Sequence, residues 1–127
     1  MIVPILTDQA PQPRGPYSQG IAGEGKILFV SMQGPFDPAS GEVVGETFAE
    51  QADQVFANIQ VIVEATGASM ADVAKVTVFL ADWRDFATLN DIFPTIFTEP
   101  YPARTPILGV PPGVLITAEA VAAIPNC

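Results

Sequence analysis

The sequence predicts an α+β fold, in which two amphipathic helices are interspersed among short strands. Apolar side chains recur at helical spacing in two windows, residues 47–66 and 82–97. Short runs rich in β-branched and aromatic residues, bounded by glycine and proline, lie around these windows and are typical of strands. With 127 residues and no linker or internal repeat, we expect a single domain over residues 1–127.

In the first half of the chain, a strand is expected over Ile27–Met32, followed by a turn at Asp37–Gly41. Thr47 and Glu50 then form the T-x-x-E pattern of a capping box, in which each residue hydrogen-bonds to the backbone of the other. This pattern predicts the start of the first helix, and Gly67 predicts its end.

In the second half, Val73–Leu80 alternates in the manner of a strand, and a helix is expected to begin near residues 82–85. Pro94 falls inside this helix. It has no N–H to donate to the carbonyl of Asn90, so we expect a kink there.

The last two strands are expected at Arg104–Val110 and Val114–Ala123, joined by residues 111–113. If they form an antiparallel hairpin, Arg104 comes within one residue of lying across from Glu119. One step of register would reverse the face that each side chain occupies.

Glu119 is the unusual residue of this chain, because it carries the only charge in the run Val114–Ile124. That run has the composition of a buried strand, and burying an unpaired carboxylate costs several kcal/mol. The chain has only five Lys and Arg side chains, of which Arg104 begins the preceding strand. The pattern indicates either a structural ion pair between Arg104 and Glu119 or a functional site.

Composition narrows the possible functions. Hydrophobic residues make up 49% of the chain and charged residues 15%, so we expect copies of the chain to cover part of the surface. The net charge of −9, with scattered Lys and Arg, disfavours nucleic acid and anionic membranes as partners. There is no signal peptide pattern at the N-terminus and no membrane-spanning run, so a cytoplasmic location is expected.

Several kinds of catalytic site are also excluded. The chain has no histidine, which excludes a Ser-His-Asp triad, a Cys-His pair and an imidazole metal ligand. Its single cysteine, Cys127, cannot form a disulfide or a zinc cluster within the chain. No phosphate-binding glycine motif is present. These absences lead us to expect no metal site.

Six blocks of sequence, in order and at the right spacing, resemble the RidA (YjgF) family of reactive-intermediate deaminases. The resemblance runs from about Ala10 to Ile124, nearly the whole chain. The blocks are Ala10-Pro11 with Gly15–Gln19, Ser31-x-Gln33-Gly34-Pro35, Asp37–Val43, Phe86–Asn90, Tyr101–Thr105 and Ile116–Ala122.

This resemblance implies a chorismate mutase-like (YjgF-like) fold, a mixed β-sheet with two helices packed on one face. It also implies a homotrimer with inter-subunit active sites that hydrolyse reactive 2-imino or enamine acids to 2-oxo acids and ammonia without a cofactor. By motif match, Arg104 would hold the substrate carboxylate and Glu119 would hold or activate water. Tyr17, Ser31 and Asn90 would line the same cleft.

The chemistry of these residue types fits those roles. Arginine binds a planar carboxylate through two parallel hydrogen bonds, which would fix the imine carbon beside a positioned water. Without histidine, a carboxylate whose pKa is raised by burial is the natural proton acceptor. The enzyme interpretation therefore expects Arg104 and Glu119 to face the same hollow.

The sequence departs from the family two residues beyond the arginine, where many members have cysteine and this chain has Pro106, which would line the substrate site. Asp82-Trp83 also resembles relatives that act on aminoacrylate in pyrimidine breakdown, in which a glutamate matching Glu119 is not expected. Two further alternatives stay open: an endoribonuclease, and a non-catalytic, chaperone-like trimer that binds 2-oxo acids.

Overall fold

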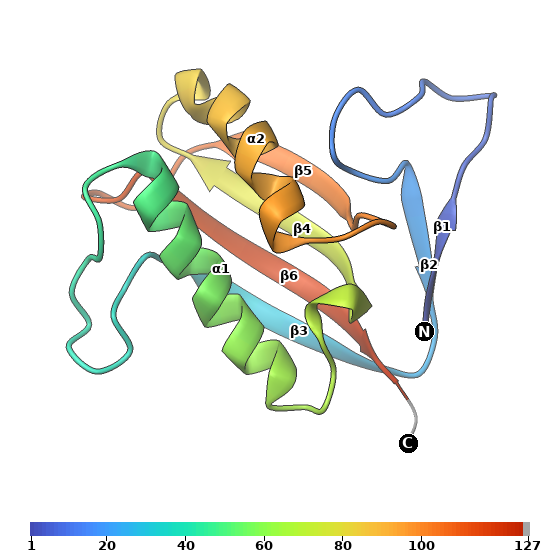
Figure 1. Ribbon diagram of the computed structural model, residues 1–127, viewed down its shortest axis with the longest axis horizontal. Helices are drawn as coiled ribbons and strands as arrows, with labels where there is room; N and C mark the ends of the chain where they lie inside the picture. The colour runs from blue at the N-terminus through green and yellow to red at the C-terminus, as the bar shows by residue number, and fades with distance from the viewer. Residues whose placement is uncertain (126–127) are drawn as a thin grey trace.

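In the computed structural model, which describes residues 1–125, two helices lie across one face of a four-stranded sheet (Figure 1). The helices are α1, Phe48–Glu64, and α2, Phe86–Ile96. Across the sheet the strand order is β3 (Lys26–Gln33), β6 (Ile116–Ile124), β4 (Val73–Leu80) and β5 (Ala103–Leu108). The predicted α+β fold with both helices on one face is confirmed. Cys127 lies outside the described residues.

The sheet is mixed, and the predicted hairpin between the last two strands is wrong. β4 lies between them, pairing in parallel with β5 and antiparallel with β6. The reason is α2: parallel strands need a crossover connection, and β4–α2–β5 forms such a unit. As a result β3 and β5, rather than β6, are the outer strands of the sheet.

Local signals placed α1 correctly. Thr47 is its N-cap, the Thr47 side chain accepts from the Glu50 N–H at 3.2 Å, and the Glu50 carboxylate accepts from the Thr47 N–H at 3.0 Å. Past the end of the helix, Gly67 has a φ of +88°, which suits glycine because it has no Cβ. Each end of α1 is therefore determined by residues close to it in the sequence.

The second helix was expected to begin near residues 82–85, but a short 3₁₀ turn, Trp83–Asp85, comes before it. Asp82 caps that turn, accepting from the Arg84 N–H at 2.8 Å, and α2 proper starts at Phe86. Pro94 lies inside α2, which ends at Ile96.

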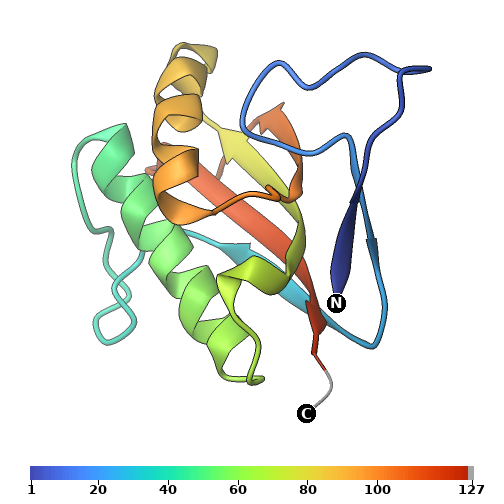
Figure 2. The same ribbon diagram turned by 45° about the vertical axis from the view of Figure 1, so that its right-hand side comes forward.

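The hydrophobic core fills the space between the helices and the sheet. Alternate residues of β4 point into it, and Val76, Val78 and Leu80 are fully buried. The other face of the sheet carries no helix, as Figure 2 shows, and the side chain of Phe29 there is 75% exposed. We call this second surface the open face of the sheet.

A separate ribbon of two antiparallel strands, β1 (Ile2–Ile5) and β2 (Gly20–Gly23), was not predicted. Its strands are short, and proline and glycine inside them argue against strands. The loop between them is tied to the start of β5, because the Ser18 N–H donates to the Pro102 carbonyl at 3.2 Å. This tie brings residues 14–17 close to α2 and β5. No helix among the described residues is long and apolar enough to cross a membrane.

Candidate active site

Arg104 is a buried cation that has no charged partner among residues 1–125. Its residue is 8% exposed, and no carboxylate in residues 1–125 lies within ion-pair distance of it. The centre of its guanidinium lies 5.4 Å from the centroid of the Tyr17 ring, 5.6 Å from that of Phe86 and 5.0 Å from that of Phe93. The Nε and Nη1 atoms are buried and make no hydrogen bond. The guanidinium thus has aromatic neighbours and unused donors.

The electrostatics of this position favour an anion. Burial lowers the pKa of the Arg104 guanidinium, and its interaction with Tyr17 partly opposes that shift. Arginine starts so far above neutral pH that it stays charged. The aromatic rings stabilise a cation through their faces, but they do not accept its N–H groups as a carboxylate would.

The loop before Tyr17 and one turn of α2 complete the surroundings of Arg104. The Tyr17 N–H donates to the Gly15 carbonyl at 2.8 Å, and the Tyr17 hydroxyl accepts from the Arg14 N–H at 3.2 Å. A Cβ on Gly15 would lie 3.6 Å from Arg104 Nη2 and 3.5 Å from Asn90 Oδ1. The structure therefore brings together three predicted site residues, Tyr17, Asn90 and Arg104.

Asn90 presents an oxygen without a partner. Its Oδ1 is buried and accepts no hydrogen bond from any group that the structure describes. Since residue 94 is proline, the Asn90 carbonyl has no helical donor four residues ahead either. Pro106 lies two residues beyond Arg104 on the same face of β5, paired with Val78 and partly buried.

Glu119 is exposed, which corrects the expectation that it is buried. In the register of the sheet it pairs with Thr77, which lies on the open face between the core residues Val76 and Val78. Alternation along β6 places Glu119 on the face of the sheet that no helix covers. The apolar composition of the run reflected burial of its neighbours, not of the glutamate.

Ser31 lies across from Glu119. Val30 pairs with Ala120 and Gln33 pairs with Ala118, so Ser31 and Met32 together oppose Glu119 in a β-bulge. Ser31 is exposed, as Glu119 is. These two predicted site residues therefore meet on the open face.

Within one chain, Arg104 and Glu119 point to opposite faces of the sheet. Arg104 pairs with Val76, a core residue beneath the helices, whereas Glu119 pairs with Thr77 on the open face. The expectation that both face one hollow is therefore wrong for a single chain, and so is a mutual ion pair. The predicted site residues form two groups: Tyr17, Asn90, Arg104 and Pro106 on one side, Ser31 and Glu119 on the other.

Two hollows on the described part of the chain contain neither Arg104 nor Glu119. One, about 490 Å³, lies between β1 and the loop at residues 99–101 and includes Tyr17. The other, about 390 Å³, lies beside the end of β3 and includes Met32 and Thr117. No three His, Cys, Asp or Glu side chains in residues 1–125 gather closely enough to hold a metal ion. Arg104 and Glu119 therefore both lie outside these two hollows.

The aromatic surroundings of Arg104 were not predicted from the sequence. Phe93 is fully buried, but Phe86 is only partly so, and Trp83 stacks on its ring at 4.6 Å between centroids. Phe86, Asn90 and Phe93 recur at helical spacing, so one face of α2 carries all three. That spacing could have indicated that these three side chains lie together beside Arg104.

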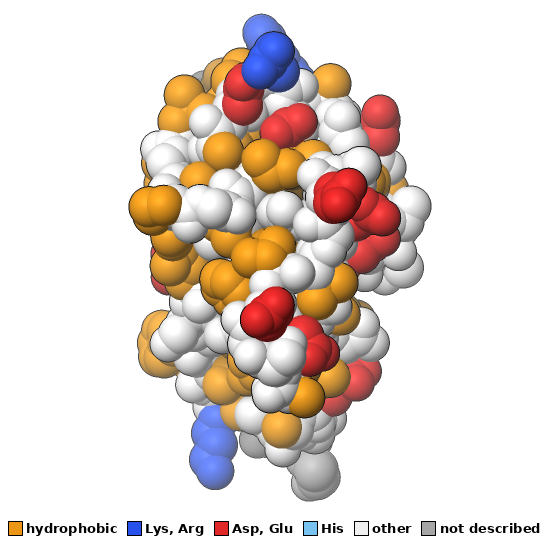
Figure 3. Space-filling view, turned by 90° about the vertical axis from the view of Figure 1, so that its left-hand side faces the viewer, with side chains coloured by type: hydrophobic (Ala, Val, Ile, Leu, Met, Phe, Trp, Pro, Cys, Tyr) orange, Lys and Arg blue, Asp and Glu red, His pale blue; other side chains and the backbone are white. Residues whose placement is uncertain are grey.

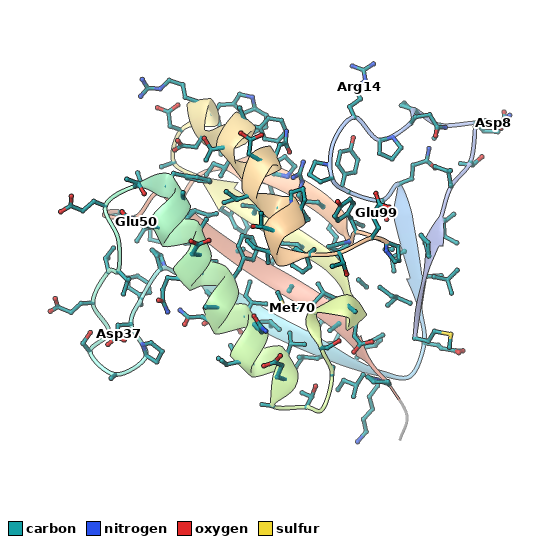
Figure 4. The ribbon with its side chains drawn as sticks, in the orientation of Figure 1. Asp8, Arg14, Asp37, Glu50, Met70 and Glu99 are labelled. Atoms are coloured by element: carbon teal, nitrogen blue, oxygen red, sulfur yellow. The ribbon has the colours of Figure 1, made fainter. Side chains whose placement is uncertain are left out.

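The surface charge gives little support to an anionic polymer as ligand. On the face shown in Figure 3, acidic side chains lie among hydrophobic ones, and Lys and Arg appear only at the two ends. Arg14 points away from the protein (Figure 4), and Arg84 is paired with Asp82 at 2.7 Å. Lys75 donates to Thr105 at 2.6 Å.

Comparison with known proteins gives consistent matches over nearly the whole chain. Residues 7–124 match the family described as Endoribonuclease L-PSP. A RutC family protein of Pyrococcus horikoshii is 46% identical over 120 residues, covering 93% of this chain and 94% of that protein. A Bos taurus protein named 2-iminobutanoate/2-iminopropanoate deaminase is 39% identical over 120 residues, covering 93% of this chain and 87% of that one.

Comparison with solved structures points to the same family as the sequence matches. The crystal structure of RidA from the Antarctic bacterium Psychrobacter sp. PAMC 21119 superposes with a TM-score of 0.74 at 43% identity, covering 94% of this chain and 98% of that one. The expected chorismate mutase-like fold is thereby confirmed. The chain belongs to the Endoribonuclease L-PSP family, which is the RidA (YjgF) family.

Proposed function

We propose that this protein is a cofactor-independent deaminase that hydrolyses reactive 2-imino acids and their enamine tautomers to 2-oxo acids and ammonia. The observation that carries the proposal is the buried, unpaired guanidinium of Arg104, with free donors at Nε and Nη1. A carboxylate is the partner that this group lacks, and relatives about 39% identical are named 2-iminobutanoate/2-iminopropanoate deaminase.

In the proposed reaction, the substrate carboxylate binds Arg104 and its C=N carbon is held beside a water. Water adds to that carbon, the nitrogen gains protons, and the C–N bond breaks to release ammonia and leave a ketone. An enamine first takes a proton on its β-carbon to become the imine. Glu119 would accept the proton of the water and pass it on, a role suited to a positioned carboxylate. Because imines hydrolyse readily in water, positioning supplies most of the catalysis.

The positions of Ser31 and Glu119 on one side, and of Arg104 on the other, support a homotrimer with sites between subunits. Ser31 lies on β3 and Arg104 on β5, which are the two outer strands of the sheet. In a closed ring of copies, β5 of one subunit would face β3 of the next, and the open face would turn inward. That arrangement would bring Ser31 and Glu119 of one copy towards Arg104 of another. It would also cover exposed apolar side chains of the open face such as Phe29.

The alternatives have weaker support. An endoribonuclease, the description of the family as a whole, would need basic contacts to RNA, and the few cations of this chain are buried, paired or far apart. An aminoacrylate deaminase would use the same site on a closely related substrate. In a non-catalytic, chaperone-like trimer, Arg104 would bind 2-oxo acids but Glu119 would have no catalytic role.

A coupled assay tests the proposal. A serine or threonine dehydratase generates the imino acid in the presence of semicarbazide, which traps it, and a deaminase shortens its lifetime. Wild-type protein should lower the semicarbazone formed, and Arg104→Ala should not, while keeping a wild-type circular dichroism spectrum. If wild-type protein leaves trapping unchanged but binds 2-oxobutyrate, the non-catalytic alternative is correct.

A further inference from the structure

We propose that Asn90 Oδ1 accepts the N–H of the bound substrate, and that this contact lets the site distinguish imino acids from the oxo acids that it releases. The inference rests on the proposed function and assigns Asn90 a specificity role beyond lining the cleft. It starts from an amide oxygen that is buried and has no hydrogen-bond donor.

The position of Asn90 Oδ1 relative to Arg104 suits a substrate that carries both groups. Both Oδ1 and Arg104 Nη2 lie about one van der Waals contact from the point where a Cβ of Gly15 would stand. Since residue 15 is glycine, that point is free of side-chain atoms. A carboxylate on the guanidinium would thus place the neighbouring carbon and its nitrogen close to the amide oxygen.

The orientation of the amide agrees with this role. Its oxygen lies 3.5 Å from the point that a Cβ of Gly15 would occupy, and Arg104 Nη2 lies 3.6 Å from the same point. An acceptor at this place suits an imine or iminium N–H. A ketone oxygen at the same place would meet another oxygen, and neither can donate.

The site can distinguish 2-imino acids from 2-oxo acids because leaving a buried hydrogen-bond acceptor without a donor costs free energy. A site built to hydrogen-bond a ligand N–H binds the analogue without it more weakly, because its own polar group is then left unpaired. The 2-oxo acid is such an analogue of the 2-imino acid. Asn90 would therefore favour substrate over product and speed product release, with an expected difference of about tenfold in affinity.

Oxamate and pyruvate are matched stable probes for this contact. Both are small planar monoanions with a carboxylate beside a carbonyl, and they differ by an NH₂ group in place of a methyl group. Calorimetric titration should show that wild-type protein binds oxamate about tenfold more tightly than pyruvate. Asn90→Leu keeps a side chain of similar shape without the acceptor, and it should bring the ratio of the two affinities close to one.

Gly15→Ala tests the place of the contact. Its methyl group would fill the space between Asn90 Oδ1 and Arg104 Nη2 at ordinary contact distances, so the fold should tolerate it while both probes bind less tightly. Gly20→Ala is the control, because the nearest atom to its methyl group would be the Ile5 Cβ at 3.8 Å, away from this site.

The outcomes separate this inference from the proposed function. Equal affinities for the two probes in wild-type protein overturn the role of Asn90, and so does a preference that survives Asn90→Leu. Failure to bind oxamate by a protein that hydrolyses imines overturns it too. The proposed function fails separately, if the dehydratase-coupled assay shows no effect of wild-type protein.

Discussion

Arg104 and Glu119 are separated by one strand and by the thickness of the sheet. Arg104 on β5 pairs with Val76, and Glu119 on β6 pairs with Thr77, the next residue of the same central strand. Successive residues of a strand point to opposite faces, so the guanidinium lies beneath the helices and the carboxylate lies on the open face. A site that uses both must draw them from two different copies of the chain.

Mixing two inactive variants tests this requirement. Arg104→Ala and Glu119→Gln should each lack deaminase activity as pure proteins. After unfolding and refolding together in equal amounts, roughly one quarter of the contacts between neighbouring copies would combine an intact Arg104 with an intact Glu119. Activity should return to about that fraction of wild type in the semicarbazide assay. Mixing without refolding serves as the control, and no recovery after refolding would contradict a site shared between copies.

Replacing Arg104 by methionine should abolish activity and leave the protein at least as stable. The side chain loses a buried charge that no carboxylate among the described residues compensates, and methionine can occupy a similar volume. The lost cation–π contacts offset part of the gain, so we expect about 1 kcal/mol of added stability. Urea unfolding measures this, with Arg104→Lys as the variant that retains the charge. A loss of several kcal/mol would show that the assembled protein supplies an anionic partner.

Phe29→Asp should prevent assembly. Phe29 is 75% exposed on the open face, in the outer strand β3, where we place the contact between copies. A carboxylate there would be buried without a partner on association, at a cost of several kcal/mol. Size-exclusion chromatography with light scattering should show a monomer without deaminase activity. Ala57→Asp, on an exposed position of α1, should assemble as wild type does.

The capping box of α1 should make stability depend on pH. Hydrogen bonds from the backbone of Thr47 and of Glu46 lower the pKa of Glu50 below its ordinary value of 4.5. The contribution of Glu50 is therefore fully present above the pKa of the unfolded state, and it is lost as the pH falls through the lower folded-state pKa. Thermal melts should show that Glu50→Gln loses less stability than wild type below about pH 4.5. Equal slopes for the two proteins would contradict the role of this carboxylate.

Asn58 should be essential for holding the segment that follows β3. Its Nδ2 donates to the carbonyls of Gly34 and Phe36, at 3.1 Å and 3.0 Å, and its Oδ1 accepts from Gln54 at 2.9 Å. Asn58→Leu leaves these groups without their partner, so the free energy of unfolding should fall by about 1–3 kcal/mol. Gln60→Leu, at an exposed position of the same helix, should change it by less than about 0.5 kcal/mol in chemical denaturation.

The features that sequence predicted well are those set by neighbouring residues. Thr47 and Glu50 lie three positions apart, so the start of α1 could be recognised directly. The family resemblance added candidate site residues, of which Tyr17, Asn90 and Arg104 do lie together.

Features that depend on pairing between distant strands were harder to predict. The face occupied by Glu119 depends on its register with β4, and the hairpin interpretation ignored the crossover through α2. The β1–β2 ribbon was missed because Pro4 and Gly20 argue locally against strands. In each case a partner far away in the sequence decided the structure.

Pro106 has a consequence beyond the substrate site, since it lies in the middle of an outer strand. An unprotected outer strand offers a continuous row of hydrogen-bond donors and acceptors, which can template the addition of further chains and lead to aggregation. Proline removes one donor from that row, so a foreign strand cannot extend along β5 without a defect. Replacing Pro106 with cysteine would therefore remove a safeguard against fibre growth along this side of the sheet.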